Sequence, residues 1–157
     1  KSPLSYMPGI SAVSPPISAI LASLHPLVIP SIISKISNAK KLGHTFVELW
    51  GDGTPSRDFL YCDDAAKGLI LAAEKYDKTE PLNLGSGEET NIENLVKMIM
   101  KLMDVNLDIH WNANMPNGQP RRCVSFEKAL QEIGFEPKTS LEEGLKKTIE
   151  WFNSSQN

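Results

Sequence analysis

An apolar, β-prone run that stops abruptly at a turn constrains this chain more than any other feature. Residues Phe46–Trp50 have the composition of a strand. Three turn-favouring residues follow within five positions: Gly51, Gly53 and Pro55. The turn places Arg57 at the end of an element, where its planar guanidinium can donate to two phosphate oxygens. Surface ion pairing of Arg57 with Asp52 or Asp58 is the alternative.

The overall composition predicts one soluble globular domain. The chain has 157 residues, of which 41% are hydrophobic and 22% charged, enough to bury a core. Its net charge of −3 provides no basic surface, so we expect no nucleic-acid partner. The longest apolar stretch, Ile17–Ile33, is broken by His25, Pro26 and Pro30, so we expect no membrane insertion either.

Cysteine and histidine positions argue against disulfide and metal chemistry. Cys62 and Cys123 are too few for a disulfide framework, and reduced thiols fit best. The three histidines are scattered and lack neighbouring ligands at metal-binding spacing, so we expect no metal. Composition and the lack of a signal peptide lead us to expect a cytoplasmic protein.

Apolar periodicity predicts four helices. The first spans Pro30–Lys41 and ends at Gly43, and the third spans Ile92–Met103. The second is capped by Asp63 or Asp64 and runs to Tyr76, with a buried stripe of Leu69, Ile70, Ala72 and Ala73. The fourth starts at a capping box from Ser140 to Glu143 and buries Leu141, Leu145, Ile149 and Phe152. An acid/base role for the adjacent Asp63 and Asp64 is a weaker alternative to capping.

Two further strands are expected between these helices. Pro81–Leu84 forms a short strand that enters the glycine-rich Gly85–Gly87, and a capping box from Thr90 to Glu93 follows. This loop fits neither the P-loop nor the dinucleotide-binding pattern. The second strand, Leu107–Trp111, leads into a polar loop, Asn112–Pro120, that delivers Arg121 and Arg122.

Several motifs in order resemble one family. They are, in chain order, Val28–Lys35, Trp50–Asp64, Asn83–Gly87, Asn114–Cys123 and the terminal Ser140–Phe152. In this order they resemble the extended short-chain dehydrogenase/reductase family of NAD-dependent nucleotide-sugar epimerases and dehydratases, and most of all its GDP-fucose synthase-like members. The likeness runs from about Val28 to Phe152.

The resemblance implies the α/β fold of the C-terminal substrate-binding part of such an enzyme. That part has short strands between helices and lacks the Rossmann core. It would occupy residues 28–157. Residues 1–27 do not match the family, and a disordered linker, a divergent insert and a sequence altered by a frame shift or gene-model error all remain open.

The resemblance also implies site residues. Val28, Ile32 and Lys35 would line the nucleotide pocket, and Trp50 would pack near the base. Arg57 and Arg122 would hold the diphosphate, with Arg121 as a neighbour. A solvated loop pair is the alternative for Arg121 and Arg122. The family usually has Asp where this chain has Ser125, so a local cap or salt bridge is expected to be missing there.

Two parts of the family's machinery are absent from this sequence. The glycine-rich turn of a Rossmann fold is missing. So is the catalytic Tyr-x-x-x-Lys, because Tyr6, Tyr61 and Tyr76 are each followed four residues later by a residue other than Lys. The parent enzyme would use NAD or NADP, and this chain alone would bind no cofactor and be inactive.

The expected partners follow from the same resemblance. They are a GDP- or UDP-linked sugar and the missing Rossmann half, and the parent enzyme would be a homodimer. The alternative function is a non-catalytic module that binds sugar nucleotides or a partner subunit.

Overall fold

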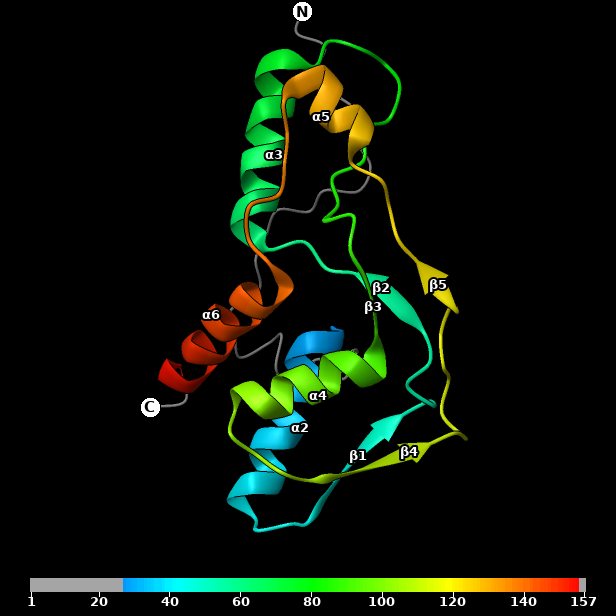
Figure 1. The fold of residues 1–157 in the computed structure, drawn as a ribbon, viewed down its shortest axis with the longest axis vertical. Coiled ribbons are helices and arrows are strands. Elements are labelled where there is room, and N and C mark those ends of the chain that lie inside the picture. The colour runs from blue at the N-terminus through cyan, green and yellow to red at the C-terminus, as the bar shows by residue number, and fades with distance from the viewer. Residues whose placement is uncertain (1–26, 156–157) are drawn as a thin grey trace, which may run out of the picture.

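A computed structural model describes residues 27–155. The expectation for the amino-terminal segment therefore lies almost wholly outside the described residues. Helices and short strands are interspersed along the chain (Figure 1). The helices are α2 (Val28–Lys41), α3 (Cys62–Lys75), α4 (Ile92–Leu102), α5 (Glu127–Ile133) and α6 (Leu141–Ser154). The strands are β1 (Phe46–Trp50), β2 (Ser56–Asp58), β3 (Glu89–Asn91), β4 (Asp108–Asn112) and β5 (Arg121–Arg122).

The strands form two small sheets. In the first, β1 pairs in parallel with β4, with Val47 opposite Ile109. In the second, β2 is the central strand, antiparallel to β3 and parallel to β5. Since β2 and β5 follow the turn and the polar loop respectively, the second sheet brings two distant segments side by side.

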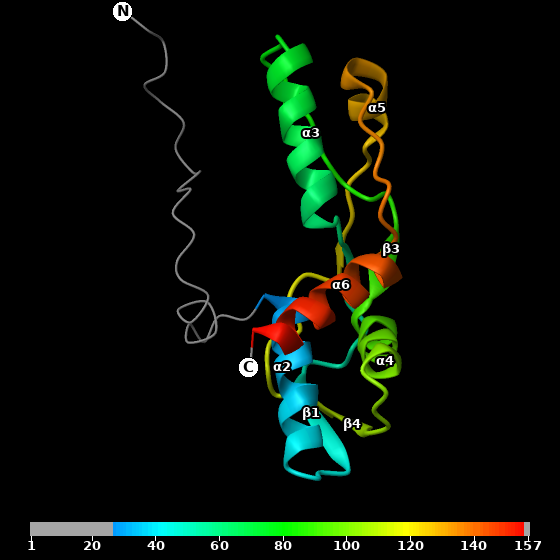
Figure 2. The same ribbon diagram turned by 90° about the vertical axis from the view of Figure 1, so that its left-hand side faces the viewer.

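The main core lies where α2, α4 and α6 meet the inner face of β1. Alternation in β1 buries Val47 and Leu49 and leaves the other three residues exposed. The apolar stripe of α4 is fully buried at Leu95, Val96 and Ile99. A second, smaller cluster joins α3 to α5 around Ala129, Ile133 and Phe135. Figure 2 shows this pair of helices standing together at one end of the molecule.

Most of the predicted helices are confirmed. α2 contains Pro30 in its first turn, α4 ends one residue before the predicted limit, and α6 buries the expected stripe with Leu141 half-buried. Ser140 caps α6 by accepting a hydrogen bond from the Glu143 amide. The strand at β4 is also confirmed, shifted by one residue.

The predictions for α3 were wrong in two respects. Tyr61 is the N-cap residue, and no side chain caps the helix. Asp64 is instead buried and accepts hydrogen bonds from the Lys138 and Thr139 amides. Of the four residues expected inside, Leu69 and Ile70 are 62% and 58% exposed and Ala73 is exposed too, since the helix packs through Gly68 and neighbours that include Ala72.

Other local predictions also need correction. Pro81–Leu84 is extended but is not a strand, because it has no strand partner among the described residues. The cap of α4 is Asn91, which accepts from the Asn94 amide, and Thr90 lies in β3. Arg121 and Arg122 lie in a short strand after the loop. Helix α5 was not predicted, because its seven residues span fewer than two full turns.

Candidate functional site

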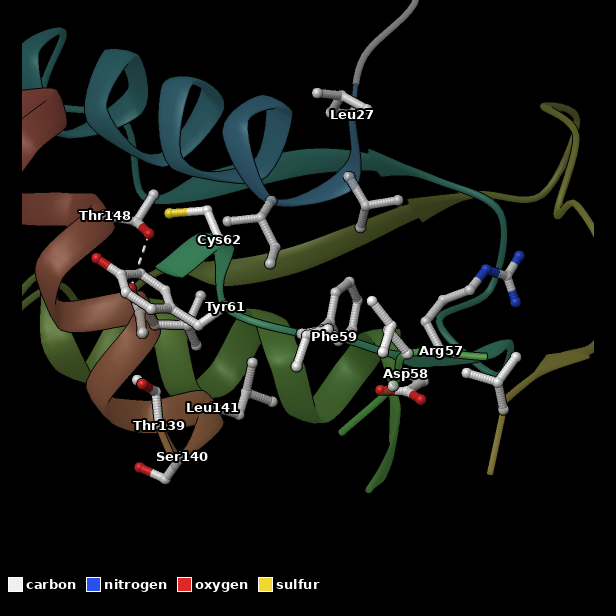
Figure 3. A pocket seen from close by; sticks show the side chains of 18 of the residues that line it. Leu27, Arg57, Asp58, Phe59, Tyr61, Cys62, Thr139, Ser140, Leu141 and Thr148 are labelled. Atoms are coloured by element: carbon white, nitrogen blue, oxygen red, sulfur yellow. Dashed lines mark hydrogen bonds between the residues drawn. The ribbon is translucent and has the colours of Figure 1, made fainter. Parts of the chain in front are cut away.

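A cleft of about 790 Å³ opens between the start of α2, the segment joining β2 to α3, and the start of α6. Figure 3 shows its side chains, with Phe59, Tyr61 and Leu141 forming a largely apolar wall and Arg57 at one end. Most lining groups are apolar, and the few polar ones include Thr139, Ser140 and Thr148 from the α6 region. The cleft therefore suits a ligand with an uncharged body and a charged group at one end.

Arg57 and Arg122 come together at the cleft. They are register partners on the parallel strands β2 and β5, and both line the cavity. Adjacent strands lie about 5 Å apart, so the two guanidinium groups emerge from neighbouring positions on one sheet. Among the described residues, no carboxylate lies within ion-pair distance of either arginine. The pairing of Arg57 with Asp52 or Asp58 is therefore not what the structure shows.

Backbone carbonyl groups hold the Arg57 side chain. Its Nη1 donates to the carbonyl oxygens of Ser56 at 2.6 Å and Gln119 at 2.7 Å. Both acceptors are neutral, so the positive charge of the guanidinium is oriented but not neutralised. A guanidinium that is oriented but keeps its positive charge can form charge-assisted hydrogen bonds with an anionic ligand.

Arg121 lies in a different environment. Its Nη2 is 2.8 Å from Glu89 Oε2, and its Nε also donates to the same carboxylate. The hydrogen bonds from Arg121 hold the pKa of Glu89 below its usual value. Because successive side chains of a strand point to opposite faces, Arg121 faces away from the Arg57–Arg122 pair.

Of the remaining predicted site residues, one lines the cleft and three lie elsewhere in the structure. Val28 lines the cleft. Ile32 is 5% exposed and lies in the main core. Lys35 donates to the Glu48 carbonyl at 3.0 Å, and its Nζ lies 5.5 Å from the ring centre of Trp50, which is half-exposed. Thus Ile32, Lys35 and Trp50 do not line this cleft.

Sequence reasoning missed several lining residues. Phe59 and Tyr61 lie inside the segment already singled out, directly after Arg57, so their position was a usable signal. Burial raises the pKa of Tyr61, and Lys147 lies over its ring at 5.2 Å. Nothing in the sequence marked Leu141 and Thr148 as cleft-lining residues, because on α6 they cannot be distinguished from residues that face the core.

The glycine-rich loop does not fit a dinucleotide. A Cβ on Gly85 would lie 2.4 Å from Val124 Cγ2, and one on Gly87 would lie 2.8 Å from a ring carbon of Phe126. These glycines thus make room for the protein's own side chains and leave no cradle for phosphates. The loop is also separated from α4 by β3, so no helix starts directly after it. This loop therefore lacks the phosphate cradle of a dinucleotide site.

The described part of the chain offers neither a cluster of metal ligands nor a helix suited to a bilayer. Residues 27–155 contain no group of three potential metal ligands. Within the same range, none of the helices combines the length and apolar character needed to span a bilayer. Cys62 is exposed, Cys123 is half-buried, and neither forms a disulfide.

Comparisons with known proteins agree on one family. Residues 23–85 match the model of the NAD dependent epimerase/dehydratase family. GDP-L-fucose synthase from Sinorhizobium fredii is 39% identical over 82% of this chain. The chain spans about 40% of the length of that relative.

Solved structures give the same result. The GDP-L-fucose synthetase of Naegleria fowleri aligns with a TM-score of 0.76 at 26% identity, over 84% of this chain and 38% of that one. The UDP-glucose 4-epimerase of Thermotoga maritima, solved with UDP-glucose, aligns with a TM-score of 0.73 at 30% identity, over 83% of this chain and 40% of that one. Motif order, fold and sequence identity together show that the chain belongs to the NAD-dependent epimerase/dehydratase family and is a homologue of the GDP-L-fucose synthases.

Proposed function

We propose that this chain is the substrate-binding portion of an NAD(P)-dependent nucleotide-sugar epimerase/reductase of the GDP-fucose synthase type. The observation that supports it best is the Arg57–Arg122 pair, in register at one end of an apolar cleft and without carboxylate partners among the described residues. Two cations so placed can bracket a diphosphate, while the apolar walls accept the uncharged part of the ligand.

In this proposal the chain supplies binding and orientation. Arg57 is held by two carbonyl groups, so it does not have to be ordered when the ligand arrives. A fixed diphosphate would hold the sugar in register for chemistry on another part of the enzyme. The cofactor, NAD or NADP, would carry the hydride there. The Naegleria fowleri relative has been solved bound to NADP. The isolated chain is expected to show no turnover.

Calorimetric titration of the chain with a GDP-sugar and a UDP-sugar tests the proposal. Losing a charge-assisted contact costs about 1.5–3 kcal/mol, so Arg57→Ala or Arg122→Ala should weaken binding roughly 10- to 100-fold. Arg121→Ala is the matched control, since it removes the same charge from the opposite face and should change affinity less than about threefold. Equal losses in all three variants, or no binding by a folded wild-type chain, would contradict the proposal.

A non-catalytic module that binds sugar nucleotides or another subunit is the second candidate. The exposed apolar side chains of α3 favour it. The reading frame upstream of Lys1 separates the two candidates: an encoded glycine-rich βαβ unit and a Tyr-x-x-x-Lys there would indicate part of an enzyme. A start codon at that position would favour the module.

A further inference from the structure

Two connections run from the β1–β4 sheet to the sheet that carries Arg57 and Arg122. The turn of residues 51–55 joins β1 to β2, and the loop of residues 113–120 joins β4 to β5. Because β1 pairs with β4 and β2 pairs with β5, both connections start and end on neighbouring strands, and Figure 1 shows them side by side. Contacts between the turn and the loop therefore influence where Arg57 points.

The turn is firmly anchored. Asp52 Oδ1 accepts hydrogen bonds from the Thr54 amide at 2.9 Å and from the Thr54 hydroxyl at 2.7 Å. The Gly53 carbonyl accepts from the Glu93 amide, at the start of α4, at 3.0 Å. The φ of Gly53 is +78°, a conformation that glycine adopts without strain. A segment that is bonded to the turn is thus bonded to the core through α4.

Asn117 joins the loop to this turn. Its Oδ1 accepts a hydrogen bond from the Asp52 amide at 3.1 Å. Among the described residues, no other side chain of the loop forms a hydrogen bond with the turn. The end of the loop has its own anchor, a bond of 2.9 Å from the Ser56 amide to the Pro120 carbonyl. The middle of the loop is therefore held through Asn117.

The segment that Asn117 holds contacts the Arg57 guanidinium. The Gln119 carbonyl accepts from Arg57 Nη1 at 2.7 Å. A Cβ on Gly118 would lie 3.2 Å from Arg57 Nη2, so the backbone passes directly beside the guanidinium. The other acceptor for Nη1 is the carbonyl of Ser56, the preceding residue on the same strand. Within the described residues, the Gln119 carbonyl is thus the hydrogen-bonding contact that ties this guanidinium to a second segment.

We propose that Asn117 is a positioning residue that acts through Arg57. By bonding to the Asp52 amide, Asn117 fixes the loop so that the Gln119 carbonyl orients the guanidinium for the diphosphate. This inference rests on the proposed function. A cation that is already oriented loses less conformational entropy when an anion binds, so Asn117 contributes to affinity only while Arg57 is present.

The order of the Arg57 side chain in the ligand-free chain tests the positioning role directly. The sequence contains three arginines, so a nitrogen-15 NMR spectrum has three Nε–H signals, which single Arg→Lys variants assign. The order parameter of Arg57 Nε should lie near the rigid value of about 0.85 and fall below about 0.6 in Asn117→Ala. The Arg121 signal is the internal reference and should not change, because its Nε donates to Glu89.

Asn114→Ala is the matched control for this measurement. Asn114 is also an exposed asparagine of the loop, and its side chain forms no hydrogen bond with the described residues. Circular dichroism should show both variants folded, since both side chains are exposed. The proposal is overturned if Asn117→Ala leaves the Arg57 signal unchanged, or if Asn114→Ala disorders it equally.

A second pair of variants displaces Asn117 without replacing it. A Cβ on Gly51 would lie 2.2 Å from Asn117 Oδ1, so Gly51→Ala should lower the order of Arg57 as Asn117→Ala does. Gly43→Ala is the control, because Gly43 also has a positive φ but has no atom within 4 Å of its Cβ. Equal Arg57 order in the two glycine variants would count against the proposal.

A double-mutant cycle tests whether Asn117 acts on ligand binding through Arg57. Loss of a neutral hydrogen bond corresponds to a change in affinity of about two- to tenfold. In calorimetric titration with a GDP-sugar and a UDP-sugar, Asn117→Ala should weaken binding by about that factor. In the Arg57→Ala background the same substitution should have less than about a twofold effect, since coupled residues are not additive. Fully additive losses would overturn the proposal.

The two measurements separate this inference from the proposed function. Arg57-dependent binding of a sugar nucleotide that Asn117→Ala leaves unchanged would overturn the positioning role alone. Loss of Arg57 order in Asn117→Ala, with no sugar-nucleotide binding by the wild-type chain, would overturn the proposed function. Asn117 would in that case still be supported as the residue that orients Arg57.

Discussion

The buried carboxylate of Asp64 links the start of α3 to the segment that precedes α6 through hydrogen bonds. Replacing Asp64 should therefore destabilise the fold. Its side chain is 1% exposed, and Oδ2 accepts from the Thr139 amide at 2.7 Å and the Lys138 amide at 3.0 Å. Hydrogen bonds to a charged group contribute about 1.5–3 kcal/mol each. Asp64→Asn keeps one acceptor oxygen and should lose about 2 kcal/mol, and Asp64→Ala about 3–4 kcal/mol. Domains of this size have only about 5–15 kcal/mol in total.

Urea unfolding followed by tryptophan fluorescence measures this loss. Asp63→Asn is the matched control, because Asp63 is exposed and lies in the same first turn, where it feels the same helix dipole. The difference between Asp64→Asn and Asp63→Asn therefore reports the bonds to the distant segment together with the 3.5 Å contact from Lys67 Nζ. If the free energies of unfolding of the two variants differ by less than about 0.5 kcal/mol, the hydrogen bonds of Asp64 do not stabilise the fold as argued.

The pH dependence gives a second test of the same carboxylate. Burial on its own raises the pKa of Asp64, but the hydrogen bonds from Thr139 and Lys138 outweigh it and hold the pKa below 3.8. A carboxyl group with a lowered folded-state pKa stabilises fully above its unfolded pKa of about 4, and this contribution is lost as pH falls through the folded value. Asp64→Asn should thus cost most at neutral pH and progressively less below about pH 4.

Two further substitutions test local packing and capping. Gly85→Ala places its Cβ 2.4 Å from Val124 Cγ2 and 2.5 Å from Asp58 Oδ2, so unfolding free energy should fall by about 1–3 kcal/mol. Gly134→Ala is the control, since no atom lies within 4 Å of its Cβ and only its φ of +72° costs about 1 kcal/mol. Ser140→Ala removes the bond from the Glu143 amide and should lower stability by about 1 kcal/mol in the same urea assay. A Gly85→Ala variant no less stable than Gly134→Ala, or an unchanged Ser140→Ala, would contradict these estimates.

Sequence patterns predicted the helices whose apolar residues all lie on one side. α4 has a single stripe that includes Leu95 and Ile99, and α6 has one that includes Leu145 and Ile149, so periodicity alone identified their buried faces. Periodicity could not identify the buried face of α3, because both faces of this helix carry apolar residues. The prediction chose Leu69 and Ile70, which the described residues leave exposed.

Strands and caps were harder to predict, because they depend on neighbours far along the chain. Leu82–Leu84 has a strand-like sequence, but a strand also needs a hydrogen-bonding partner, and sequence does not reveal whether one is present. The Ser125 departure was expected to remove a local cap, yet its Oγ accepts a hydrogen bond from the Glu127 amide at the start of α5. A serine hydroxyl can thus replace an aspartate in this local role.

The candidate site was predictable only where a residue type has a distinctive chemistry. Arg57 and Arg122 were named from sequence, and the structure pairs them in register at the cleft. Arg121 is adjacent in sequence, but its assignment depended on strand alternation and on the position of Glu89, which is more than thirty residues away. Whether Arg57 and Arg122 bind a diphosphate remains a prediction for titration.

Helix α3 is joined by Asp64 to a second segment that lines the cleft. Tyr61 and Cys62 at its start line the cleft, and Asp64 joins it to Thr139. Thr139 and the neighbouring Ser140 also line the cleft. The hydrogen bonds of Asp64 therefore hold together two of the segments that form the cleft wall. Since ordering a binding site before the ligand arrives lowers the cost of binding, Asp64→Asn should also weaken sugar-nucleotide binding in the same calorimetric titration.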